Sequence, residues 1–195
     1  MILKYLGMLA MVTSSLLHAS QWPHLSLPEF KARQAKAAEW VRDCTTILEI
    51  GGGQHPITQF ALPAQKVIVI DPAIKRKEEE NIYHIPQAFE KWIKVAGSTG
   101  PEGLGTNYAV ILLGLQLVMP DNAWPKLVNL IDNSTKTVIE YSLENADAKK
   151  QVKQIQRDTH KRIVQELELD LSAKTVYKGK KVFSNRKMVL FAAKE

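Results

Sequence analysis

The sequence predicts an α/β fold with a mostly parallel sheet that ends in an antiparallel hairpin. Three observations support this prediction. Short apolar runs, typical of strands buried on both faces of a parallel sheet, are separated by segments with helical periodicity. Three glycines, Gly51, Gly52 and Gly53, follow the first run directly, and Asp71 follows the second. The last two runs have only a short connection, which joins antiparallel strands, whereas parallel strands need a long crossover.

The predicted elements follow one another in a regular order. Strands are predicted at seven runs, which are residues 45–50, 66–70, 82–85, 108–113, 137–141, 174–177 and 187–191. Helices are predicted at three longer segments with apolar residues at helical spacing, which are residues 28–43, 125–131 and 145–169. A short helix is expected between Pro56, which suits a first helical turn, and Pro63, which ends it. The charged residues 75–80 leave room for only a stub of helix, and four glycines within residues 97–105 predict a loop.

The first twenty residues are typical of a secretory signal peptide. Lys4 precedes a mostly apolar stretch, residues 5–17, and small residues follow at Ala19 and Ser20. That stretch is shorter than the roughly 20 residues that span a bilayer, so an uncleaved membrane anchor is the weaker alternative. We therefore expect residues 1–20 to be removed on export to the periplasm or the medium. Residues 21–195 are then enough for one domain with a full core.

The composition argues against several classes of function. The formal net charge is +6, but acids lie beside several of the lysines and arginines, so a solvated surface explains the charge more simply than a nucleic-acid groove, and a weak anionic partner stays open. Cys44 is the single cysteine, so no intrachain disulfide can form. The histidines show no metal-ligand spacing, and we expect no metal site.

The glycines and Asp71 together predict a nucleoside-binding crevice. Glycines after a strand let the backbone turn tightly and approach a ligand closely. Asp71 lies twenty positions after Gly51, at the end of the second strand, where an acid typically binds the two hydroxyls of a ribose. An ordinary turn before Pro72 is the alternative for Asp71 alone. Its spacing from the glycines favours ribose binding.

A nicotinamide-binding domain has a similar pattern but fits this sequence less well. It places a pyrophosphate on a helix N-terminus, where backbone N–H groups point at the ligand. Here Pro56, which has no N–H, occupies the position of the last glycine in that pattern. Glu49 would repel a pyrophosphate, whereas it suits a cationic ligand.

Residues 28–195 resemble the class I S-adenosylmethionine-dependent methyltransferases. The resemblance is based on Glu49 and the glycines that follow it, on Asp71 and on the terminal hairpin. The family has a three-layer, Rossmann-like fold whose seven-stranded sheet ends in such a hairpin. The resemblance implies S-adenosylmethionine as the cofactor and a methyl acceptor as the partner. It places the glycine backbone under the methionine part of the cofactor, Glu49 toward its amino group and Asp71 at its ribose. It also implies that Gln87, Ala88 and Phe89 contact the adenine and that Gly114 lines the methyl-transfer pocket.

The sequence departs from the family pattern at identifiable positions. His55 replaces the third glycine, and the helix expected between the second and third strands is nearly absent. Asn107 and Tyr108 open the fourth strand, where many members carry an acid. The only candidates for a general base are Glu140, Tyr141 and His55, each of which has a structural role as its alternative. The sequence does not identify the methyl acceptor, the catalytic base or the oligomeric state.

An export signal conflicts with a cofactor that is a cytosolic metabolite. Three explanations remain open: delivery into a cell that supplies the cofactor, retention at the inner face of a membrane, or loss of catalysis. The function predicted first is therefore methyl transfer to an unidentified acceptor. The alternative is an exported, non-catalytic domain that binds a small molecule or a protein on the same scaffold.

Overall fold

The computed structural model describes residues 28–53, 56–75, 77–95, 103–114, 123–170, 175–177, 180–182 and 185–193. The predicted signal peptide and His55 lie outside these ranges. Within them, no helix has the length and apolar character needed to cross a membrane.

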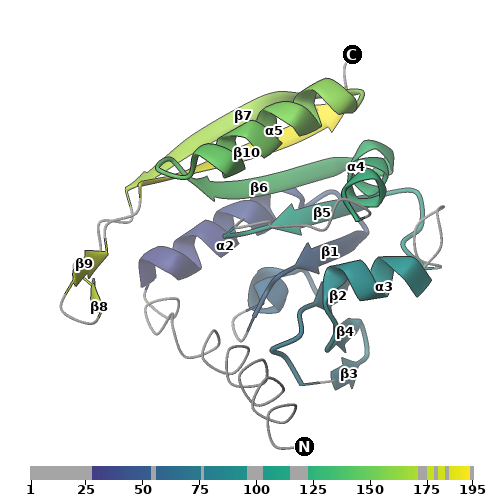
Figure 1. The fold of residues 1–195 in the computed structure, drawn as a ribbon. Helices are drawn as coiled ribbons and strands as arrows, with labels where there is room; N and C mark the ends of the chain where they lie inside the picture. Colours follow the sequence, from purple (N-terminus) through teal and green to yellow (C-terminus); the bar gives the residue numbers. More distant parts are fainter. Residues whose placement is uncertain are drawn as a thin grey trace, which may run out of the picture.

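An eight-stranded sheet forms the centre of the molecule, with the strand order β3-β4-β2-β1-β5-β6-β10-β7 (Figure 1). Its strands are β1 (Thr46–Ile50), β2 (Lys66–Ile70), β3 (Lys77–Glu79), β4 (Ile82–Ile85), β5 (Tyr108–Leu112), β6 (Lys136–Ser142), β7 (Lys161–Asp170) and β10 (Asn185–Ala193). The five strands from β4 to β6 in this order are parallel, and β10 is antiparallel to both β6 and β7. The predicted α/β class with a mostly parallel sheet is confirmed.

Helices cover both faces of the sheet, which gives three layers (Figure 1). One face packs against α2 (Pro28–Trp40) and the 3₁₀-helix η2 (Ile57–Phe60), and the other against α3 (Phe89–Val95), α4 (Trp124–Asn133) and α5 (Ala146–Asp158). The central strands therefore bury side chains on both sides. In β1, Ile47 points into the core beneath α2, while Leu48 and Ile50 point into the core beneath α3, α4 and α5. This double burial explains why the central strands are mostly apolar.

The long helix predicted at residues 145–169 is wrong in its second half. The helix α5 ends at Asp158, and β7 begins at Lys161 and pairs with β10 along its whole length. Ile163 and Leu167 are four positions apart, a spacing that fits a helix and that also occurs in strands. In β7 they pack against opposite faces of the sheet, because the register with β10 shifts between Leu190 and Phe191. The pairing with β10 decides between helix and strand, because it supplies backbone hydrogen bonds at this edge of the sheet.

An antiparallel pair at the end of the sheet is confirmed, but the predicted partner of its last strand is wrong. Residues 175–177 form β8 (Thr175–Tyr177), which pairs with β9 (Lys180–Val182) in a separate two-stranded sheet. Figure 1 shows this small sheet standing apart from the eight-stranded one. The partner of β10 is β7, which lies earlier in the chain.

A strand replaces the stub of helix expected at residues 75–80. The strand β3 pairs antiparallel with β4 at the edge of the sheet and makes it eight-stranded instead of seven-stranded. Its charged residues carry no strand periodicity, so the exposed backbone edge of β4 determines this pairing. The helix α3, which begins at Phe89, was also not predicted.

Candidate functional site at the carboxyl edge of the sheet

Four parallel strands end on one edge of the sheet, and the predicted site residues follow them there. Ile50 pairs with Ile70, and Ile70 pairs with Ile85, so β1, β2 and β4 end at the same level. The residues after β1, β2, β4 and β5 are the ones selected from the sequence, namely Gly51, Gly52, Gly53, Asp71, Gln87, Ala88, Phe89 and Gly114. The topology thus brings together positions up to 63 apart in the chain.

The glycine turn has a geometry that other residues would strain. Gly51 and Gly53 have positive φ angles of 80° and 56°, which L-residues with side chains rarely adopt. Gly52 has no such angle, but a Cβ atom there would lie 2.7 Å from Oε2 of Glu49 and 2.9 Å from Cγ1 of Val69. Each of the three glycines is therefore required by backbone conformation or by the close approach of a neighbour.

The carboxylate of Glu49 lies buried directly beneath this turn. Its side chain is 1% exposed, and Oε2 accepts a hydrogen bond of 2.8 Å from the backbone N–H of Ile57 in η2. Burial raises the pKa of Glu49 to about 7, although the Ile57 N–H and the positive charge of Arg33 act in the opposite direction. Glu49 therefore changes charge near neutral pH. Its contact with a cofactor amino group stays a prediction.

Asp71 connects the glycine turn to the end of β2. Oδ2 accepts a hydrogen bond of 3.0 Å from the N–H of Gly53, and Oδ1 accepts one of 2.7 Å from the N–H of Ala73. Asp71 therefore stabilises a turn, which was the alternative interpretation of an acid before Pro72. Each carboxylate oxygen can accept a further hydrogen bond, and the side chain is only half-buried. Ribose binding remains compatible with this geometry and stays a prediction.

The segment after β4 holds the three residues predicted to contact adenine, and one of them has an exposed side chain. Gln87 is exposed, and its N–H donates to the carbonyl of Ile85 over 2.8 Å. Phe89 is 6% exposed, and its ring packs in the core with its centroid 6.0 Å from that of Trp92. Among the three residues predicted to contact adenine, Gln87 is therefore the one with a freely accessible side chain. The three contacts stay predictions.

A buried ion cluster, which the sequence did not reveal, lies beneath α2. Glu140 on β6 is fully buried and accepts hydrogen bonds from the guanidinium groups of Arg33 on α2 and Arg186 on β10. The Arg186 bond measures 2.9 Å, and a Cβ atom on Gly114 would lie 3.7 Å from the same Nη1. Arg33 and Arg186 lie 107 and 46 positions from Glu140, so no local pattern connects them.

This cluster changes the assessment of the candidate general bases. Two guanidinium groups hold the Glu140 carboxylate in a fully buried position, which gives it a structural role. Tyr141 points to the opposite face of the sheet, into the core beneath α3, α4 and α5, and burial raises the pKa of its hydroxyl. His55 lies outside the described residues. No catalytic base is therefore assigned.

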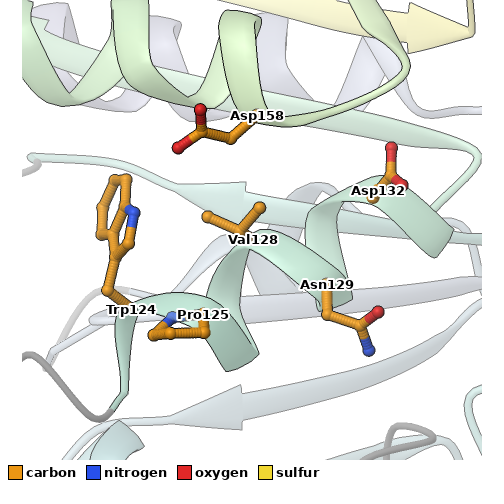
Figure 2. Close-up of a pocket in the computed structure, with 6 residues that line it drawn as sticks. All are labelled: Trp124, Pro125, Val128, Asn129, Asp132 and Asp158. Carbon is orange, nitrogen blue, oxygen red and sulfur yellow. The ribbon is translucent and has the colours of Figure 1, made fainter.

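A surface hollow of about 330 Å³ lies elsewhere, between α4 and the end of α5 (Figure 2). It is lined by Trp124, Pro125, Val128, Asn129, Asp132 and Asp158. Both acids already have partners, because Asp132 binds His160 and Asp158 pairs with Arg157. None of the predicted site residues lines this hollow. In the part of the chain that the structure describes, no group of three or more potential ligands could hold a metal ion.

Three of the solved structures with a similar fold are methyltransferases by name. An N1-methyltransferase from Burkholderia thailandensis, solved with 1,6-didemethyltoxoflavin and S-adenosylhomocysteine, superposes with a TM-score of 0.63 at 10% identity, over 98% of this chain and 90% of that one. The N-methyltransferase NodS from Bradyrhizobium japonicum gives a TM-score of 0.56 at 15% identity, over 88% and 99% of the two chains.

The chain has the fold of a class I methyltransferase.

A third structure, magnesium protoporphyrin IX methyltransferase from Synechocystis with bound S-adenosylmethionine, gives a TM-score of 0.54 at 12% identity, over 85% and 80% of the two chains. No protein-family model and no curated protein matches the sequence. The likeness to these methyltransferases therefore concerns the fold, and β3 is an addition to the seven strands expected for it.

The carboxyl edge of this methyltransferase fold suits a ligand that carries positive charge. Nothing lies within 4 Å of the Cβ positions of Gly51 and Gly53, so the described neighbours leave the turn open. Beneath the turn lies the Glu49 carboxyl group, and beside it the half-buried Asp71. An open glycine backbone with two acids would accommodate a sulfonium and an ammonium group, as S-adenosylmethionine has.

Proposed function

We propose that this protein is an S-adenosylmethionine-dependent methyltransferase that acts on an acceptor still to be identified. The observation that carries the proposal is the glycine turn at the end of β1, which rests on Glu49 and is bonded to Asp71. It lies at the carboxyl edge of a methyltransferase fold, where open α/β sheets bind their ligands.

The residues at this edge would bind and orient the two reactants. The backbone of Gly51, Gly52 and Gly53 allows close approach, and the negative charge of Glu49 complements a cationic ligand. The free acceptor positions of Asp71 suit a pair of hydroxyl groups. The cofactor would supply an electrophilic methyl group on its sulfonium centre. Catalysis would then depend mainly on alignment of the acceptor with that group.

The three similar methyltransferases do not define the acceptor, because two of their names refer to different compounds and the third, NodS, names none. We propose that the acceptor binds beside Gly114, at the end of β5. The part of the predicted loop at residues 103–105 lies at the opposite edge of the sheet, where the carbonyl of Gly103 accepts a hydrogen bond from Lys66 at the start of β2. Export also remains a proposal, supported by Lys4 and the apolar stretch at residues 5–17. N-terminal sequencing of the protein from its native cell tests it, and a mature chain that begins near Gln21 is expected. A chain that retains residues 1–20 would favour a membrane anchor.

Calorimetric titration with S-adenosylhomocysteine tests the cofactor site. The wild-type protein is expected to bind with micromolar affinity, and Asp71→Ala to weaken binding by roughly 10- to 100-fold, because hydrogen bonds to a charged group contribute about 1.5–3 kcal/mol. Asp43→Ala is the matched control, since Asp43 is exposed and pairs with Lys136 at the opposite edge of the sheet. It is expected to bind like the wild type.

A folded wild-type protein that does not bind S-adenosylhomocysteine would contradict the proposal. It would favour a binding domain for another molecule on the same scaffold. Equal weakening by Asp71→Ala and Asp43→Ala would instead show that Asp71 has no specific part in the site. Far-ultraviolet circular dichroism of each variant separates loss of binding from loss of the fold.

A further inference from the structure

Four charged side chains are buried together on the face of the sheet that α2 covers. Arg33, Glu49, Glu140 and Arg186 are 7%, 1%, 0% and 9% exposed. Burying charges costs free energy unless they are closely paired, and a hydrophobic replacement often gives equal or greater stability. Stability alone is therefore a weak reason for this cluster, and its place beside the glycine turn indicates a role in the site.

The guanidinium of Arg33 is held in a fixed position. Its Nη1 donates to Oε2 of Glu140, while Oε1 of Glu140 accepts from Arg186 over 2.9 Å. The three side chains come from α2, β6 and β10, so the guanidinium of Arg33 is bonded to β6 directly and linked to β10 through Glu140. An arginine held in this way can act as a fixed positive charge on its surroundings.

The same turn of α2 also contacts the segment that holds Glu49. Gln34, the next residue, accepts a hydrogen bond of 3.4 Å from Gln59 in η2. The first residue of η2 is Ile57, whose N–H donates to Oε2 of Glu49. Glu49 and Glu140 also lie on the same face of the sheet, on the two strands that flank β5. Arg33 is thus placed over the region between two buried carboxylates.

The charged groups that face Glu49 act in opposite directions. Arg33, from α2, favours the charged form of the carboxyl group, and Asp71, from the end of β2, disfavours it. Burial also disfavours the charged form, and the N–H of Ile57 favours it. Among the described residues, Arg33 supplies the positive charge in this balance.

We propose that Arg33 is a positioning residue of the cofactor site, which favours the negatively charged form of the Glu49 carboxyl group beneath the glycine turn. Glu140 and Arg186 hold the Arg33 guanidinium where it exerts this effect. The inference rests on the proposed function, because a negative Glu49 serves to bind a cationic ligand. It makes α2, a helix that precedes the whole sheet in the chain, an electrostatic part of the site.

The test is calorimetric titration with S-adenosylhomocysteine between pH 5.5 and 8.5. Wild-type binding is expected to strengthen as Glu49 loses its proton, with a midpoint near pH 7. Arg33→Met is expected to move that midpoint to higher pH, which weakens binding at pH 7 and has a much smaller effect at pH 8.5. Arg33→Lys keeps the charge and should restore most of the wild-type profile.

Two further variants separate this effect from a general loss of structure. Lys36→Met removes a positive charge from the same helix, where Lys36 pairs with Glu39 on the outer surface, and should leave the profile unchanged. Glu49→Gln should abolish the dependence on pH. Equal weakening by Arg33→Met at every pH would show a purely structural role and would overturn the inference.

The coupling between Arg33 and Glu49 can also be measured without a ligand. The difference in unfolding free energy between the wild type and Glu49→Gln, followed from pH 4 to 9, reports the titration of Glu49. Its midpoint should rise when the same difference is measured in the Arg33→Met background, and an unchanged midpoint would overturn the inference. If the wild type does not bind S-adenosylhomocysteine at any pH, the proposed function fails, whereas this measurement still decides whether Arg33 controls Glu49.

Discussion

Substitution of Gly52 by alanine tests the central feature of the site, the packing of the glycine turn on Glu49. The new Cβ atom would lie 2.7 Å from Oε2 and 2.9 Å from Cδ of Glu49, and 2.9 Å from Cγ1 of Val69. Ordinary contacts between carbon atoms lie at about 3.5–4.0 Å. Neither neighbour can move easily, because the Glu49 carboxyl group is bonded to Ile57 and Val69 is fully buried.

The expected cost is the difference between two effects. Overpacking in a well-packed region costs about 1–3 kcal/mol. Replacing glycine by alanine also restricts the unfolded chain, which returns about 0.4–1 kcal/mol. We therefore expect Gly52→Ala to lower the free energy of unfolding by about 1–2 kcal/mol. In a domain of this size the melting temperature should fall by roughly 2–8 °C.

Urea denaturation of a double-mutant cycle with Glu49→Ala measures this effect. Without the Glu49 carboxyl group the principal clash disappears, and Gly52→Ala should cost at least about 1 kcal/mol less than in the wild type. Gly53→Ala is the matched control: no described atom lies within 4 Å of its Cβ position, and its φ of 56° makes its cost, about 1 kcal/mol, independent of Glu49. If Gly52→Ala costs the same in both backgrounds, Glu49 does not lie beneath the turn and the reasoning is refuted.

Three further predictions concern Glu49, the core and the cysteine. Burial raises the pKa of Glu49 from 4.5 to about 7, so the folded protein retains this proton to a higher pH than the unfolded chain does. The unfolding free energy of the wild type relative to that of Glu49→Gln should therefore fall by up to about 3 kcal/mol between pH 4.5 and 7. A difference that stays constant over this range would contradict the raised pKa. Phe191→Ala, at a fully buried position of β10, should cost about 3–5 kcal/mol in urea denaturation, whereas Val164→Ala, at a 42% exposed position of β7, should change stability by less than about 0.5 kcal/mol. Cys44 is 2% exposed, and burial raises the pKa of its thiol to about 11. A disulfide reagent at pH 8 should therefore label Cys44 only in denaturant. Rapid labelling of the native protein would contradict this prediction, because it would show that the thiol is accessible.

The strands of the parallel core could be predicted from the sequence because their environment is uniform. β1, β2 and β5 are buried on both faces, so each is mostly apolar, and the observed bounds differ from the predicted ones by at most one residue at either end. The glycine turn and Asp71 could be found for a similar reason. Each follows directly on such a strand, and their spacing along the chain reflects a single turn and crossover.

The edges of the sheet could not be predicted in this way. β7 carries apolar residues at a spacing that fits a helix or a strand, and β3 consists of charged residues with no strand periodicity. The choice at both places depends on a neighbouring strand with an unpaired edge, β10 in one case and β4 in the other. That neighbour is supplied by the fold and has no local signal.

The sequence by itself thus determined the α/β class, the parallel core and the turn on which the proposed site is built. Only the tertiary structure decided which strands complete the sheet and which charges surround Glu49. Arg33, Glu140 and Arg186 come from three elements that are far apart in the chain, and they meet because α2 packs across β6 and β10. Local patterns report how a segment is buried, whereas ion pairs between distant elements depend on the packing of the whole molecule.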